Sequence, residues 1–176
     1  MAEQKWYETT HRWCQTNLTE IDAEVCDIGF WKQYWRQNHI QGIIVNAGGI
    51  VAYYPSRFPL QYRSRYLKDR DLLREFTDAA REMVLRVVAR MDINRATKEF
   101  VDARPDWFAR DRSGAPYAAG GRFLSCVNSG YYTEYIPQLL EEILTTYHPD
   151  GITDNSWQGP SAKQICYCDT CREKFR

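Results

Sequence analysis

The chain has 176 residues and carries 23 basic and 23 acidic side chains, so its formal net charge is zero. This balance, without a long run of either sign, argues against nucleic-acid binding and against attraction to an anionic membrane. The first residues lack the apolar stretch of an export signal, and the most apolar segment, 43–52, is interrupted by Asn46 and two glycines. We therefore expect a globular, cytoplasmic protein with no membrane partner.

The first half of the chain alternates strand and helix patterns. Residues 12–17 predict a short strand, and 22–38 predict a helix whose apolar face carries Phe30, Trp31, Tyr34 and Trp35. Residues 42–47 form a continuous apolar run typical of a buried parallel strand. A loop rich in Tyr, Arg and Pro follows over 53–68, and loops of this length are usually functional. Asp69 or Asp71 is expected to cap the next helix, which leads into a strand over 85–92.

The second half repeats this order after an irregular insertion. Residues 94–128 predict an elaborated loop with a short helix at 96–101 and a small hairpin near 114–123. A helix over 131–147, with Pro137 in its first turn or at a bend, precedes a strand at 151–154. A further helix begins near Cys171. Four such units predict an α/β fold in which residues 1–176 form the N-terminal half of a (β/α)8 TIM barrel, with parallel strands and crossover helices.

Three cysteines lie within six residues, at Cys166, Cys168 and Cys171, in the loop after the fourth strand. Closely spaced thiolates on a tight turn are typical ligands of structural zinc, which takes four of them in a tetrahedron. The fourth ligand is open among Cys126, Cys14, Cys26 and a histidine. We favour Cys126, because the loops after strands three and four of a barrel open on the same face. Cys14 and Cys26 fall within the first strand and helix and are interpreted as buried apolar residues.

The segment from Asp154-Asn155-Ser156 to the cysteine cluster resembles glycoside hydrolase family 42 β-galactosidases and a related group of hypothetical barrel glycoside hydrolases. In family 42 an Asp-Asn-Glu triplet ends the fourth strand, and a Cys-x-Cys-x-x-Cys run binds zinc together with one earlier cysteine, to which Cys126 corresponds. The specific motif covers 154–176, while the earlier units match in layout. The resemblance implies a sugar-cleaving barrel enzyme with structural zinc.

One position departs from this pattern. The acid/base glutamate of family 42 is replaced here by Ser156, and a serine hydroxyl cannot act as a general acid near neutral pH. The related hypothetical hydrolases resemble this chain in ending the strand with Asp-Asn and no glutamate. The family 42 mechanism therefore cannot be transferred to this chain unchanged.

The chemistry of a parallel barrel lies at the carboxyl ends of its strands. Glycosidases need two carboxyl groups, and Asp154 and Asp92 are our catalytic candidates. Asp154 is equally well explained as a turn residue, Asp92 is better explained as an ion-pair partner of Arg90, and a second catalytic carboxylate can lie beyond residue 176. Polar and aromatic residues near strand ends are predicted to bind sugar: Asn17, Asn46, Tyr53, Arg90, Asn155 and Trp157.

The sequence is compatible with more than one class of function. We expect a glycosidase acting on O-glycosyl bonds of a carbohydrate substrate, with homo-oligomerisation open for the full-length protein. The alternative is a non-catalytic carbohydrate-binding or regulatory barrel, which the replacement by Ser156 suggests. A zinc-ribbon interaction module is disfavoured, because only one compact cysteine cluster exists.

Overall fold

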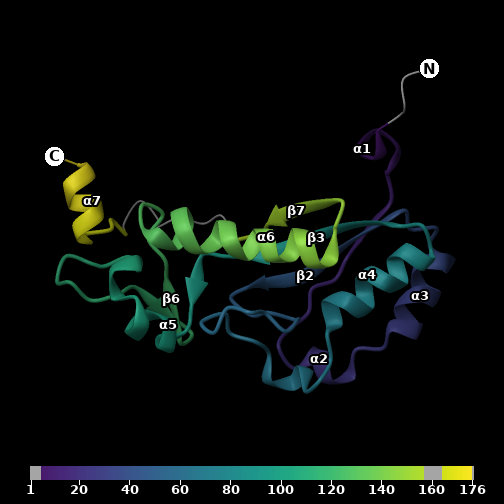
Figure 1. The fold of residues 1–176 in the computed structure, drawn as a ribbon, viewed down its shortest axis with the longest axis horizontal. Coiled ribbons are helices and arrows are strands. Elements are labelled where there is room, and N and C mark those ends of the chain that lie inside the picture. The colour runs from purple at the N-terminus through teal and green to yellow at the C-terminus, as the bar shows by residue number, and fades with distance from the viewer. Residues whose placement is uncertain (1–4, 157–163, 176) are drawn as a thin grey trace.

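The computed structural model describes residues 5–156 and 164–175, and a four-stranded parallel sheet is its centre (Figure 1). Strands β1 (Trp13–Gln15), β2 (Gly42–Gly49), β3 (Arg86–Asp92) and β7 (Gly151–Asp154) lie side by side in chain order. Every neighbouring pair is parallel. Sequential parallel strands joined by helices are the arrangement of a (β/α)8 barrel, and the predicted α/β partial barrel is confirmed.

Helices cover one face of this sheet. α4 (Leu72–Glu82) packs on β2 and β3, and α3 (Ile28–Gln37) and α6 (Ile136–Tyr147) pack against α4. The two faces of β3 differ in burial: Val87, Ala89 and Met91 are buried under the helices, while Val88, Arg90 and Asp92, which point to the other face, are half-exposed. In a closed barrel this half-exposed face would point into the barrel interior.

The predicted helix over 22–38 is two helices. α2 (Asp22–Val25) ends before Asp27, whose carboxylate accepts a hydrogen bond from the Gly29 amide (2.8 Å) and so caps α3. The predicted apolar face was partly wrong. Trp35 is buried, but Phe30 and Tyr34 are exposed. Within α3, Phe30 and Tyr34 are four residues apart and lie on one side, whereas Trp31 and Trp35 lie on the side that packs against Phe76 of α4.

The remaining elements lie mostly in the insertion after β3. They include a three-stranded antiparallel sheet of β4 (Arg95–Ala96), β6 (Arg122–Leu124) and β5 (Ala118–Ala119), which contains the predicted hairpin. The other elements are α1 (Trp6–Thr9), α5 (Lys98–Ala103), α7 (Asp169–Lys174), the 3₁₀ turns Arg65–Leu67 and Pro105–Trp107, and a π-helical turn Tyr131–Tyr135. Pro137 lies in the first turn of α6, as predicted. None of the described helices has the length and apolarity needed to span a bilayer.

A buried carboxylate fixes the long loop after β2. Glu142 on α6 accepts hydrogen bonds from the Tyr54 hydroxyl (2.9 Å), the Ser56 hydroxyl (2.7 Å) and the Arg57 amide (2.6 Å). Its side chain is 7% exposed, so these bonds compensate its lost hydration. The loop that follows β2 is thereby held against α6 rather than left free in solvent.

Candidate functional site

Polar side chains meet at the carboxyl edge of the sheet, on the face without helices. Asn46 of β2 and Arg90 of β3 are register partners, so their side chains share that face. The Arg90 guanidinium donates to the Asn17 side chain and lies 3.3 Å from the Asp92 carboxylate. Asn155 lies on the same side, with its amide nitrogen 3.5 Å from Asp92 Oδ1. The structure thus brings together five of the predicted site residues.

An open cavity of about 360 Å³ lies at this edge of the sheet. Asn17, Asn46, Tyr53, Arg90 and Asp92 all contribute to its wall. Arg90 is 11% exposed and Asp92 24% exposed at the side chain, so the ion pair is shielded without being inaccessible. The buried Nε of Arg90 has no hydrogen-bond partner among the described residues. A cavity with an ion pair and converging amides provides donors and acceptors for sugar hydroxyls.

Tyr53 forms part of this wall without offering a free hydroxyl. It is 4% exposed, and its hydroxyl donates to the Leu18 carbonyl (3.0 Å). Burial raises the pKa of Tyr53 to about 12, with a smaller contribution from nearby carboxylates. It therefore stays neutral at physiological pH and supports the loop after β1. Trp157, the other predicted aromatic contact, lies outside the described residues.

Asp154 does not join this group. Its register partner on β3 is Met91, so its side chain lies on the helix-covered face of the sheet, opposite to Asp92. One carboxylate oxygen accepts hydrogen bonds from the amide (2.9 Å) and hydroxyl (2.7 Å) of Ser156, as in an Asx turn. The charge of Asp154 also contributes to raised pKa values of Tyr131 and Tyr132, for which burial is the main cause. The two predicted catalytic carboxylates are therefore not brought together.

Ser156, at the position of the family 42 glutamate, is a buried structural residue. Its hydroxyl oxygen accepts hydrogen bonds from the backbone amides of Ile93 (2.6 Å) and Asn94 (3.1 Å) while donating to Asp154. With 8% of the residue exposed, it joins the end of β7 to the chain just after Asp92. The replacement thus has a physical role, which a single sequence does not reveal.

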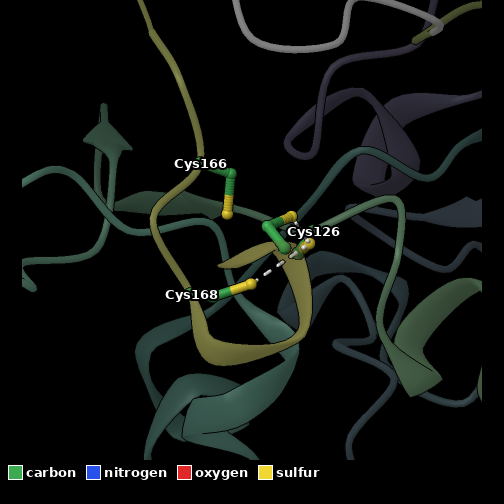
Figure 2. Close-up of side chains that lie close together, drawn as sticks. Cys126, Cys166 and Cys168 are labelled. Atoms are coloured by element: carbon green, nitrogen blue, oxygen red, sulfur yellow. Dashed lines mark hydrogen bonds between the residues drawn. The ribbon is translucent and has the colours of Figure 1, made fainter. Parts of the chain in front are cut away.

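The four predicted metal ligands converge. The sulfur atoms of Cys126, Cys166, Cys168 and Cys171 all lie within 4.8 Å of one another. The sulfur of Cys126 is 3.4 Å from that of Cys171 and 3.6 Å from that of Cys168, and Figure 2 shows Cys166 on the same loop as Cys168. Tetrahedral zinc with Zn–S bonds of about 2.3 Å requires sulfur–sulfur separations of about 3.8 Å. The donor set therefore fits a four-coordinate zinc ion.

The thiols differ in their electrostatic surroundings. Burial raises the pKa of Cys126 well above its usual range and raises that of Cys168 to about 11. Burial also acts on Cys171, but hydrogen bonds from Asn128 and the neighbouring thiols outweigh it and lower the pKa. Cys14 and Cys26 are half-buried, and burial raises the pKa of each.

Two polar residues of the cavity wall were not predicted. Thr19 and Glu20 line the cavity beside Asn17. Glu20 accepts a hydrogen bond from the Tyr62 hydroxyl (2.6 Å), so it connects the loop after β1 to the loop after β2. Their position a few residues after the first strand was the available signal, since loops at this edge of a barrel line its site.

Comparison with known proteins shows the family of the chain. The family described as "Hypothetical glycosyl hydrolase 6" matches residues 31–156. The β-galactosidase BgaH of Haloferax lucentense is 31% identical over 83 residues, which cover 44% of this chain and 12% of that protein. The expected resemblance to hypothetical barrel glycoside hydrolases is confirmed by the family match.

Solved structures show the same fold. α-L-Fucosidase isoenzyme 2 from Paenibacillus thiaminolyticus superposes with a TM-score of 0.71 at 23% identity, covering 95% of this chain and 26% of that one. A hypothetical protein from Ruminiclostridium thermocellum gives 0.64 at 10% identity, covering 86% and 78%. The α-fucosidase of Thermotoga maritima gives 0.53 at 17% identity, covering 76% and 30%. The chain spans a minor part of the β-galactosidase and both fucosidases, and it belongs to the hypothetical glycosyl hydrolase 6 family.

Proposed function

We propose that the full-length protein is a glycoside hydrolase and that this chain supplies part of its substrate cavity. The observation that carries the proposal is the convergence of Asn17, Asn46, Arg90, Asp92 and Asn155 at one edge of the sheet. The family membership supports the reaction class. Galactosides and fucosides are the first substrates to test, because the similar proteins are named as enzymes of these sugars.

Asp92 is the carboxylate best placed to act on a sugar. It lies on the open face, 3.3 Å from the Arg90 guanidinium, and a carboxylate in this position can serve as a nucleophile or general base. Arg90 and the surrounding amides would orient sugar hydroxyls around it. Glycoside hydrolysis needs a second carboxyl group. Glu20 is another carboxylate on this cavity wall, and a second one contributed from beyond residue 176 stays a prediction.

The second candidate function is sugar binding in the same cavity without hydrolysis. The position of the family 42 glutamate is a buried serine here, and Asp154 faces away from the cavity. Full-length protein should be screened against nitrophenyl glycosides of galactose and fucose in both anomers, with calorimetric titration of the free sugars in parallel. We expect turnover of at least one glycoside. Binding of a free sugar with no turnover of any glycoside would favour the binding protein.

We also propose that the cysteine cluster holds one structural zinc ion. With four thiolates it leaves no open position for water, so the ion would brace the insertion after β3 against α7 rather than take part in hydrolysis. Metal analysis of the full-length protein should find about one zinc per chain, lost in Cys168→Ser and kept in Cys14→Ser. Zinc retained at full content in Cys168→Ser would contradict this ligand assignment.

A further inference from the structure

A second cavity of about 370 Å³ lies beside the first and shares the wall formed by Asn17 and Leu18. Its other side includes Phe30 and Trp31 at the start of α3 and the carboxylates Asp22 and Asp27. In a parallel β/α unit the start of the helix lies at the carboxyl end of the preceding strand. The second cavity therefore opens at the same edge of the sheet as the first.

The chemistry of this cavity combines an aromatic surface with carboxylates. The Phe30 side chain is 58% exposed, although it stacks on Tyr34 (6.3 Å between ring centroids) and meets Trp31 edge to face (5.7 Å). The ring is thus held in place by its neighbours while much of it stays uncovered. One oxygen of Asp22 accepts hydrogen bonds from the amide and hydroxyl of Thr19, and one oxygen of Asp27 accepts from the Gly29 amide. Among the described residues, no hydrogen bond involves the other oxygen of either aspartate.

We infer that this second cavity, which we call the α3 subsite, binds a further sugar ring of an oligosaccharide whose cleaved residue occupies the Asp92 cavity. A pyranose packs its C–H face on an aromatic ring and donates its hydroxyls to carboxylate oxygens, which is what Phe30 and the two aspartates offer. Asn17 lies between the two cavities and contacts both. The inference rests on the proposed function and adds the class of substrate, a sugar chain rather than a single glycoside.

The competing explanation is structural. Exposed aromatics on α3 also suit packing against the rest of a closed barrel, in which case Phe30 would stabilise the full-length protein and act equally on every substrate. The two roles differ in one measurable quantity, the ratio of kcat/KM for a disaccharide to kcat/KM for the methyl glycoside of the same terminal sugar. Only a subsite changes this ratio.

The experiment compares wild type, Phe30→Ala, Phe30→Trp and Tyr7→Ala in the full-length protein. Tyr7 is a matched control, because it is a similarly exposed aromatic (57%) on α1 that lines neither cavity. We expect Phe30→Ala to lower the ratio about tenfold, as loss of one aromatic contact predicts, and Phe30→Trp to keep it within about twofold. An unchanged ratio in Phe30→Ala overturns the α3 subsite, whether or not both rates fall together.

A calorimetric arm separates this inference from the proposed function. If wild type cleaves neither compound, the proposed hydrolase is wrong, and the affinities for the disaccharide and the methyl glycoside are compared instead. Tighter disaccharide binding that is lost in Phe30→Ala supports the α3 subsite in a binding protein. Equal affinities in wild type, or no binding of either compound, overturn it.

Discussion

Replacement of Ser156 by alanine should destabilise the full-length protein without touching the cavity wall. The Ser156 hydroxyl accepts from two backbone amides, of Ile93 and Asn94, and donates to Asp154 in a site where the residue is 8% exposed. Its removal leaves the two amides without this acceptor and takes away one of the two hydrogen bonds to Asp154 Oδ1, which keeps the bond from the backbone amide of residue 156. A buried polar group left without a partner costs about 1–3 kcal/mol, and relaxation of the turn recovers part of this, so we expect a loss of about 2–4 kcal/mol.

The assay is urea unfolding followed by tryptophan fluorescence, with Ser113→Ala as the control. Ser113 makes a comparable hydroxyl–aspartate bond, 2.7 Å to Asp111, but in an exposed turn, so its loss should cost less than about 0.5 kcal/mol. Ser156→Glu should be worse than Ser156→Ala, because a charged side chain would enter a buried site. A Ser156→Ala protein as stable as Ser113→Ala would refute the bridging role.

Other consequences of the structure can be measured in the same protein. Gly49 has a φ of +101°, and an added Cβ would lie 2.2 Å from the Asp92 carbonyl oxygen. Gly49→Ala should therefore lower the free energy of unfolding by more than about 2 kcal/mol. The control is Gly114→Ala, which should cost about 1 kcal/mol, because Gly114 has a similar φ of +89° but no atom near an added Cβ. Glu142→Gln should lower the free energy of unfolding by about 1–3 kcal/mol and increase proteolysis of the loop after β2. The reason is that an NH₂ group, which cannot accept a hydrogen bond, replaces one of the two carboxylate oxygens that now accept three hydrogen bonds from this loop. Zinc should leave the cysteine cluster as pH falls, because protons compete for its thiolates; metal content that is constant down to about pH 4 would argue against thiolate ligands.

Local patterns predicted the strands and helices well where one face of an element meets the core. The apolar run over 42–47 became β2, and the helix predicted after Asp71 became α4, with Asp71 as its cap. The sequence pattern did not predict the break between α2 and α3. Asp27 lies inside an apolar pattern, and only the structure shows that its carboxylate accepts a hydrogen bond from the Gly29 amide and so begins a new helix. Propensity alone does not reveal such a cap inside an apolar pattern.

The sequence indicated which polar residues end the strands, but it did not indicate the face of the sheet on which each of them lies. Asn46, Arg90 and Asp92 were candidates because they end predicted strands, and in the structure they are neighbours. The face on which Asp154 lies depends on the pairing of β7 with β3, and a shift of one residue would reverse it. Such a register is fixed by contacts across more than 60 residues of chain, which a single sequence does not show. For the same reason the convergence of Cys126 on the later cluster was an argument from barrel geometry rather than from spacing.

We propose that Asp92, and not Asp154, is the carboxylate that acts on the sugar. Asp92→Asn and Asp154→Asn should be compared in the full-length protein on the glycoside that the screen identifies. We predict that Asp92→Asn lowers kcat by about 10³-fold with unchanged zinc content and unfolding midpoint, while Asp154→Asn stays within about tenfold of wild type in kcat and loses stability. Full activity in Asp92→Asn, or abolished activity in a stably folded Asp154→Asn, would contradict the account.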